Sequence, residues 1–141
     1  MFEFVHHVAY AVDDMDKIIN DFESLFGLEL KERKTVSNGT TFEMATFQCG
    51  ETIIEFQRPI DYPELEKFLK DRGPGLTHVG YGVRNLPEKM KELEKKGIKF
   101  NGDAATAPTG WLISNFSFED GQLAYFDDPY HDDHLADADS K

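Results

Sequence analysis

The sequence predicts an α+β fold made of two copies of a βαβββ unit. The stretch His7–Val12 (HVAYAV) is echoed by His78–Val83 (HVGYGV), with histidine, valine, tyrosine and valine at the same places, 71 residues apart in a chain of 141. Downstream, Gly27–Leu30 (GLEL) matches Gly97–Phe100 (GIKF) at an offset of 70. The stretches between these matches have helical spacing of apolar residues, so each copy is expected to contain a strand and then a helix.

Each copy opens with an alternating strand. Because successive side chains in a strand point to opposite faces, the histidine shares its face with two alanines or two glycines, while valine and tyrosine side chains occupy the other face. The small residues are expected to leave open space beside the histidine.

The helix of each copy has recognisable ends. In the first copy Asp13 or Asp14 can cap the helix and Gly27 supplies a left-handed stop. In the second copy Pro87 lies in the first turn and Gly97 is the stop. The core-facing stripe of the first helix consists of Met15, Ile18, Ile19, Phe22, Leu25 and Phe26, and that of the second contains Met90 and Leu93.

Three strands are expected to complete each copy. They span about Leu28–Thr35, Thr40–Gln48 and Thr52–Gln57 in the first copy, and Ile98–Asn101, Trp111–Phe118 and Gln122–Asp127 in the second, with turns at Cys49–Glu51 and Glu119–Gly121. A short helix over Tyr62–Asp71 is expected between the copies. The predicted organisation is a single domain over residues 1–129, with module one at about 4–60, a linker helix at about 61–75 and module two at about 76–129. An acidic tail, expected to be disordered, follows at 130–141.

Composition excludes several classes of function. A formal net charge of −12 repels phosphate backbones, so nucleic acid is not an expected partner. No apolar run approaches the roughly 18 residues of a membrane span, and the N-terminus lacks the features of a secretory signal. Cys49 is the only cysteine, which excludes an intramolecular disulfide and favours the cytoplasm.

The two equivalent histidines indicate a metal site. If the first strands of the copies meet near a pseudo-twofold axis, His7 and His78 can converge on one point. Two neutral imidazoles leave the charge of a cation unbalanced, and a carboxylate on a neighbouring strand is the usual complement. Glu55 is the candidate, because an ionised group between Ile54 and Phe56 would be costly if it were buried without a partner.

Duplication does not supply a fourth ligand of the same kind. The counterpart of Glu55 in the last strand is Tyr125, which could be a phenolate ligand, an acid or base, or a hydrogen-bond donor to substrate. Glu43 is the only carboxylate within Thr40–Gln48 and is a second catalytic candidate. Whether it shares a face with Glu55 depends on the number of residues in the hairpin loop between them.

The sequence resembles the vicinal oxygen chelate superfamily, which includes glyoxalase I, methylmalonyl-CoA epimerases, extradiol dioxygenases and bleomycin-resistance proteins. The resemblance covers about residues 4–129 and is closest to the epimerases, through His6–Val12, Gly50–Phe56 and Leu65–Val79. It implies a cupped sheet and a metal held by two histidines and two oxygen ligands, matched here by His7, Glu55 and His78. Tyr125 stands where the family pattern has a glutamate.

The resemblance also implies a range of functions. We expect a metal-dependent isomerase or lyase that stabilises the enolate of a small 2-oxo or 2-acyl substrate, such as methylmalonyl-CoA, with zinc, cobalt, nickel, manganese or iron as the ion. Two histidines and one carboxylate also describe the ligands of non-haem iron dioxygenases, which is one alternative. A non-catalytic binding protein of the bleomycin-resistance type is another. Family members form the site within one chain or across a dimer, and a homodimer is expected.

Overall fold

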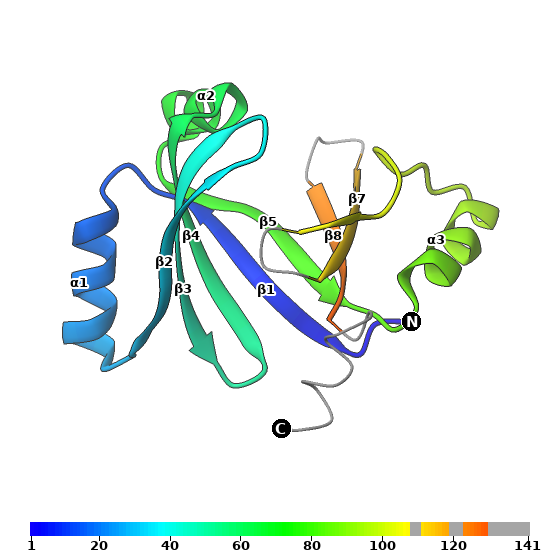
Figure 1. Cartoon of the computed structure of the whole chain (residues 1–141), viewed down its shortest axis with the longest axis horizontal. Coiled ribbons are helices and arrows are strands. Elements are labelled where there is room, and N and C mark those ends of the chain that lie inside the picture. The colour runs from blue at the N-terminus through cyan, green and yellow to red at the C-terminus, as the bar shows by residue number, and fades with distance from the viewer. Residues whose placement is uncertain (108–110, 119–122, 130–141) are drawn as a thin grey trace. The chain divides into compact units, whose positions relative to one another are not determined.

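The computed structural model describes residues 1–107, 111–118 and 123–129, which fold into two compact units (Figure 1). The first unit is His7–Thr77. The second unit combines Met1–His6 with the chain from His78 onward. The division falls inside the first strand, so the adjacent residues His6 and His7 belong to different units.

The first unit contains one βαβββ copy followed by a helix. It contains the part of β1 (Phe4–Ala11) that begins at His7. The elements that follow are α1 (Met15–Phe26), β2 (Leu30–Ser37), β3 (Thr41–Cys49), β4 (Thr52–Asp61) and α2 (Pro63–Arg72). The strands lie in the order β2-β3-β4-β1, and β1 runs parallel to its neighbour β4. The predicted first copy is confirmed, with β4 extending four residues beyond its expected end.

Helix α1 forms where the sequence predicts it and covers one face of these strands (Figure 1). The Asp14 side chain accepts a hydrogen bond from the Lys17 N–H at 3.0 Å, and Gly27 ends the helix with a φ of 68°. The first part of the predicted stripe, up to Phe22, packs into a core whose buried members are Val12, Met15, Ile19, Ala45, Phe47 and Phe56. Leu25 and Phe26, also predicted to face the core, are instead 71% and 64% exposed, because they lie in the last turn of the helix, beyond this core. This face of the unit is therefore filled by the helix, which leaves the opposite face for a site.

The second unit repeats the arrangement. It contains the part of β5 (Gly75–Gly82) that begins at His78. The elements that follow are α3 (Leu86–Lys95), β6 (Ala105–Thr106), β7 (Leu112–Ser117) and β8 (Leu123–Asp128). The strands lie in the order β5-β8-β7-β6, with β5 parallel to β8. Helix α3 packs against a core of Val83, Leu86, Met90, Leu112, Phe116, Ala124 and Phe126. The predicted α+β class, with one βαβββ copy in each unit, is confirmed.

The first of the three later strands in this copy was predicted wrongly. Residues 98–101 form no strand; the two-residue strand β6 at Ala105–Thr106 takes that place. Ile98 and Phe100 instead pack against the α3 core, and the backbone N–H of Asn101 donates one hydrogen bond to the Asn115 carbonyl. Burial of these apolar side chains thus replaces a paired strand. The predicted turn at Glu119–Gly121 and the tail at 130–141 lie outside the described residues.

Among the described helices, none has the length and apolar character needed to cross a lipid bilayer.

The space expected beside one of the small residues on β5 is occupied. A Cβ atom added to Gly82 would lie 2.6 Å from Cε1 of the Phe4 ring. The Glu3 N–H also donates to the Gly82 carbonyl at 2.9 Å. The start of the chain is therefore fitted closely to the end of β5, and glycine is needed there because the Phe4 ring fills the position of a side chain.

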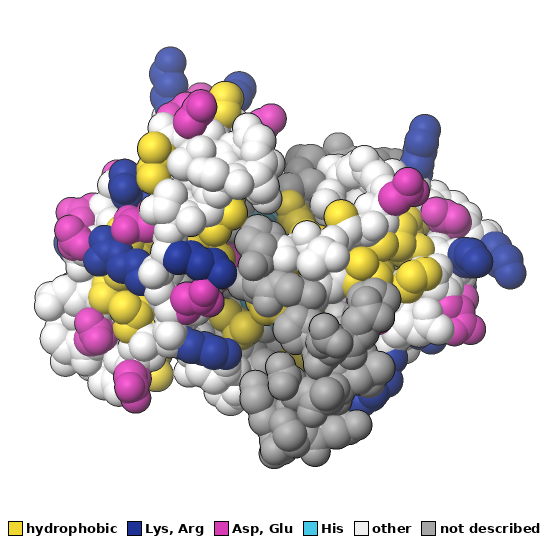
Figure 2. Space-filling model, in the orientation of Figure 1, with side chains coloured by type: hydrophobic (Ala, Val, Ile, Leu, Met, Phe, Trp, Pro, Cys, Tyr) yellow, Lys and Arg dark blue, Asp and Glu magenta, His cyan; other side chains and the backbone are white. Residues whose placement is uncertain are grey.

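An ion network lies in the first unit beside the start of α1. The Arg33 and Arg58 Nε–H groups donate to the two carboxylate oxygens of Glu43 at 2.9 and 3.2 Å, and the Arg33 Nη2 donates to Asp16 at 2.7 Å. Burial acts to raise the pKa of Glu43, but the hydrogen bonds and positive charge of the two arginines outweigh it and lower that pKa. Charged side chains of both signs are interspersed on the face shown in Figure 2.

Replacement of Gly82 by alanine should destabilise the fold. The new methyl group has to displace the Phe4 ring, and such overpacking typically costs about 1–3 kcal/mol. Urea unfolding of Gly82→Ala should show this loss. Gly75→Ala is the matched control, because no atom lies within 4 Å of its Cβ position and its backbone is not left-handed; its stability should change by less than about 0.5 kcal/mol. Equal losses in the two variants would contradict the close fit at Gly82.

Replacement of Glu43 by glutamine should make stability less dependent on pH. Because the folded pKa of Glu43 lies below its unfolded value near 4.5, its contribution is complete above that value and is lost as pH falls through the folded pKa. With the arginines partly exposed, we expect Glu43→Gln to cost about 1–2 kcal/mol at pH 7. The difference from the unmodified protein should shrink below about pH 4. A difference that stays constant from pH 7 to pH 3 in urea unfolding would contradict the network.

Candidate metal centre

The first unit brings two of the predicted ligands together. In the parallel pair of β1 and β4, His7 lies opposite Ile53 and Ala9 lies opposite Glu55. Glu55 is therefore two residues beyond the partner of His7 and shares its face. Their ligand atoms lie within 4.8 Å of each other, and the His7 side chain is buried. A histidine and a carboxylate are thus placed side by side on the face opposite α1.

The orientation of the Glu55 carboxylate is restricted by its neighbour on β4. The Gln57 Nε2 donates a hydrogen bond to Glu55 Oε2 at 3.1 Å. The carboxylate also acts on Tyr62, at the start of α2, whose pKa is raised by burial and by the negative charges of Glu64 and Glu55. Glu55 therefore sits in a partly buried setting where its charge is felt by surrounding groups.

The second unit repeats this geometry with one different residue. In the parallel pair of β5 and β8, His78 lies opposite Leu123 and Gly80 lies opposite Tyr125. Tyr125 is thus two residues beyond the partner of His78, just as Glu55 is two residues beyond the partner of His7. The rings of His78 and Tyr125 are in contact and tilted, with centroids 4.0 Å apart and an angle of 31° between their planes. The structure therefore gives the same equivalence of Glu55 and Tyr125 that the sequence repeat predicts.

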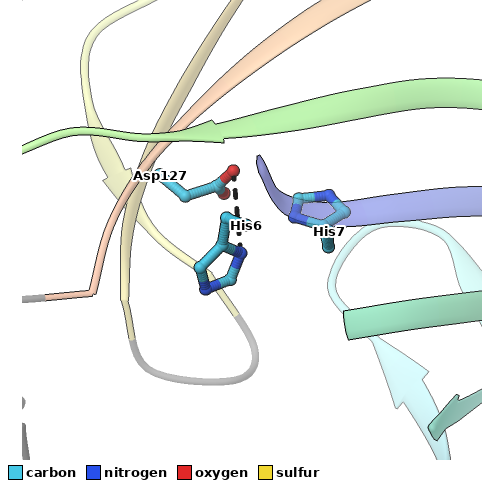
Figure 3. A group of neighbouring side chains, drawn as sticks. All are labelled: His6, His7 and Asp127. Carbon is cyan, nitrogen blue, oxygen red and sulfur yellow. Dashed lines mark ion pairs between the residues drawn. The ribbon is translucent and has the colours of Figure 1, made fainter. Parts of the chain in front are cut away.

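A second buried histidine was not expected to take part in an ion pair. In the second unit, the His6 Nδ1 lies 3.9 Å from an oxygen of Asp127, and Figure 3 shows the two side chains facing each other. Both side chains are buried, and the His6 ring contacts the Trp111 ring edge-on at 4.4 Å between centroids. One feature of the sequence could have indicated Asp127: it is two positions after Tyr125 and therefore lies on the same face of β8.

The structure does not bring Glu43 together with Glu55. The hairpin between β3 and β4 has a two-residue loop, so that Cys49 pairs with Thr52, Thr46 with Glu55, and Glu43 with Arg58. Glu43 is three residues from the partner of Glu55 and therefore lies on the opposite face of the sheet. It belongs to the ion network beside α1 and is not a candidate for chemistry at His7.

The donor set fits a divalent metal ion. In the first unit, His7 and Glu55 offer an imidazole nitrogen and a carboxylate side by side, and zinc and the neighbouring transition metals accept both kinds of ligand. The His7 side chain, and that of His78 in the second unit, are both buried, with 5% and 7% of their surfaces exposed.

A family comparison places the chain among known proteins. The sequence model of the Glyoxalase/Bleomycin resistance protein/Dioxygenase superfamily matches residues 6–114. Among curated proteins, mitochondrial methylmalonyl-CoA epimerase from Mus musculus is 27% identical over 104 residues, which are 72% of this chain. The chain spans 57% of the length of that relative.

Solved structures share the fold at low sequence identity. Methylmalonyl-CoA epimerase from Mycobacterium tuberculosis aligns with a TM-score of 0.83 and 22% identity, over 91% of this chain and 89% of that one. A hypothetical protein from Bacillus halodurans C-125 gives 0.80 and 20%, over 89% and 93%. An epimerase from Streptomyces coelicolor, in complex with 2-nitronate-propionyl-CoA, gives 0.80 and 17%, over 91% and 98%. With the fold and the match over residues 6–114 in agreement, the chain belongs to the Glyoxalase/Bleomycin resistance protein/Dioxygenase superfamily.

Proposed function

We propose that this protein is a metal-dependent isomerase of the methylmalonyl-CoA epimerase type, which acts on a carboxyacyl-CoA thioester. The observation that carries the proposal is the repeated histidine: His7 and His78 occupy equivalent positions in the two copies, and Glu55 lies beside the first of them. In this proposal His7, Glu55 and His78 hold one divalent ion, which is zinc, cobalt, nickel, manganese or iron.

The choice of substrate rests on the relatives. The curated relative from mouse is a methylmalonyl-CoA epimerase, and the Streptomyces coelicolor structure contains 2-nitronate-propionyl-CoA. The first name points to a branched carboxyacyl thioester, whose α-hydrogen lies between two carbonyl groups and is acidic for a C–H bond, and the second ligand is a propionyl thioester with a nitronate on the same carbon. The same class of compound fits the small 2-acyl substrate that the sequence predicts.

Epimerisation requires a proton to leave the α-carbon on one face and another to return on the opposite face. A divalent ion would supply Lewis-acid stabilisation of the negative charge that develops on the thioester oxygen. His7 and His78 would contribute neutral nitrogen ligands, and Glu55 would balance part of the positive charge. Gln57 would hold the Glu55 carboxylate in one orientation, because its amide already donates to that group.

Tyr125 is our candidate for direct contact with the substrate. It occupies the position equivalent to Glu55, and its ring contacts that of His78. Its phenol oxygen can serve as a proton donor and acceptor or as an oxygen ligand. Glu43 has no part in this proposal, because it lies on the opposite face of the first unit.

A second candidate function is favoured by one observation. Tyr125 stands where the repeat would place a carboxylate, so of the two equivalent positions beside the histidines only the one at Glu55 carries an acidic group. A chain that binds an acyl-CoA without transforming it would show this pattern. Such a protein would bind methylmalonyl-CoA and leave its α-hydrogen in place.

Metal binding should depend on His7 and not on its neighbour. We expect the unmodified protein to bind a single equivalent of Co²⁺ or Zn²⁺ by calorimetry, and His7→Gln to lose most of that affinity because a nitrogen ligand is removed. His6→Gln is the matched control and should retain it, since His6 belongs to the His6–Asp127 pair. Gln57→Leu should weaken binding by about tenfold. Binding that survives His7→Gln but fails in His6→Gln would contradict the ligand assignment.

Isomerase activity should appear as exchange of the α-hydrogen. With metal-loaded protein in D₂O, methylmalonyl-CoA should gain deuterium at the α-carbon, and EDTA or His7→Gln should abolish the exchange. Tyr125→Phe should lower the rate by about 10²-fold or more if the phenol moves a proton. Glu51→Gln, in the exposed β3–β4 turn, is the control and should exchange normally. Binding of methylmalonyl-CoA without exchange at any metal concentration would favour the second candidate.

A further inference from the structure

Strand β3 carries a buried polar side chain that has no part in the function proposed so far. Thr46 lies directly opposite Glu55 in the antiparallel pair of β3 and β4. Its neighbours along β3, Ala45 and Phe47, belong to the buried core that α1 packs into. Because successive side chains of a strand point to opposite faces, the Thr46 side chain lies on the other face, which carries His7 and Glu55.

Burial makes a hydrogen bond important for the Thr46 hydroxyl. Only 5% of the surface of Thr46 is exposed. Across residues 1–107, 111–118 and 123–129, no group forms a hydrogen bond with this hydroxyl. A hydroxyl that is buried without a partner is unfavourable, and native proteins rarely keep one without a reason. The Thr46 hydroxyl is therefore a donor available to an acceptor on this face of the first unit.

Two carboxylates flank Thr46 across the sheet. Glu32 of β2 lies opposite Thr46 on one side, and Glu55 of β4 lies opposite it on the other. The Glu32 side chain is 41% exposed, and its Oε1 is paired with the Lys34 Nζ at 2.8 Å. Glu55 is half-buried. Because a hydrogen bond is stronger where water competes less, Glu55 is the acceptor that is stabilised more by the hydroxyl.

The hydroxyl can reach Glu55 without a change in the backbone. The Cβ atoms of directly opposite residues in an antiparallel pair lie about 4.5–5.5 Å apart, and rotation about one bond moves a threonine hydroxyl among its staggered positions. The Gln57 Nε2 already donates to Glu55 Oε2. An ionised carboxylate has about four acceptor positions. Glu55 can therefore accept hydrogen bonds from Gln57 and Thr46 and also bind an ion.

We propose that Thr46 is a positioning residue of the metal centre, and that its hydroxyl donates to the Glu55 carboxylate when the site holds its ion. This inference rests on the proposed function. A hydroxyl donates more strongly to an ionised acceptor than to a neutral one. Ligating carboxylates are commonly held by hydrogen bonds from surrounding groups. Thr46 and Gln57 hold this carboxylate from two directions, one across the sheet and one along β4.

Thr46→Val tests this role because it removes the hydroxyl and nearly keeps the size of the side chain. We expect the dissociation constant for Co²⁺, measured by calorimetry on the full chain, to rise about tenfold. Thr46→Ser keeps a hydroxyl and should restore most of the affinity. After treatment with EDTA, the urea midpoint of Thr46→Val should not fall, because the hydroxyl that it removes has no partner among the described residues. A purely structural role would instead lower that midpoint.

Thr35→Val is the matched control. Thr35 also lies opposite a glutamate across two strands, but its partner is Glu43, on the opposite face of the first unit. This variant should keep the Co²⁺ dissociation constant within about twofold.

Unchanged Co²⁺ binding in Thr46→Val would overturn the role of Thr46 while the proposed function stands. Equal losses of affinity in Thr46→Val and Thr46→Ser, or in Thr46→Val and Thr35→Val, would do the same. An unmodified protein that binds no Co²⁺ would overturn the proposed function and this inference together.

Discussion

The parallel pairing of the first and last strands of each copy determines where the candidate ligands lie. In β1 and β4, and again in β5 and β8, the residue two positions beyond the partner of the histidine shares its face. Glu55 and Tyr125 occupy these positions, so one strand register serves both copies. A shift of one residue in either pair would turn the partner of the histidine into the helix-covered core. Everything proposed about the site depends on this register.

Much of the fold follows from local sequence signals. The repeat at His7 and His78 specifies two copies, and Asp14 and Gly27 mark the ends of α1 because capping and left-handed geometry act within a few residues. The strand expected at 98–101 does not form, because the structure there is decided by packing and not by local signals. Ile98 and Phe100 have strand-like apolar spacing, but the core of the second unit buries them without a partner strand. Such packing depends on residues distant in sequence, which local pattern cannot supply.

The same distinction between local signals and long-range contacts applies to the candidate site. The repeat singled out His7, and the charge between Ile54 and Phe56 singled out Glu55, while the register of β1 with β4 puts both on one face. The position of Glu43 could not be decided without the length of the β3–β4 loop, and the two-residue loop that forms puts it on the other face. The His6–Asp127 pair depends on a contact between residues more than 100 positions apart in the sequence. Alternation along β8 puts Asp127 on the face of Tyr125, but it does not show that His6 lies opposite Asp127.

The assignment of Met1–His6 to the second unit has a consequence for how the chain can be divided. The sequence repeat invites a cut between the modules, near Gly75, to obtain two half-proteins. Such a cut would leave the Phe4 ring on one fragment and Gly82, which it packs against, on the other. The second half would lack its own first segment, and the first half would carry an apolar segment with nothing to cover it. The two copies are therefore linked through the N-terminus, and a fragment that begins at His78 would need Met1–His6 attached after its C-terminal end to be a whole unit.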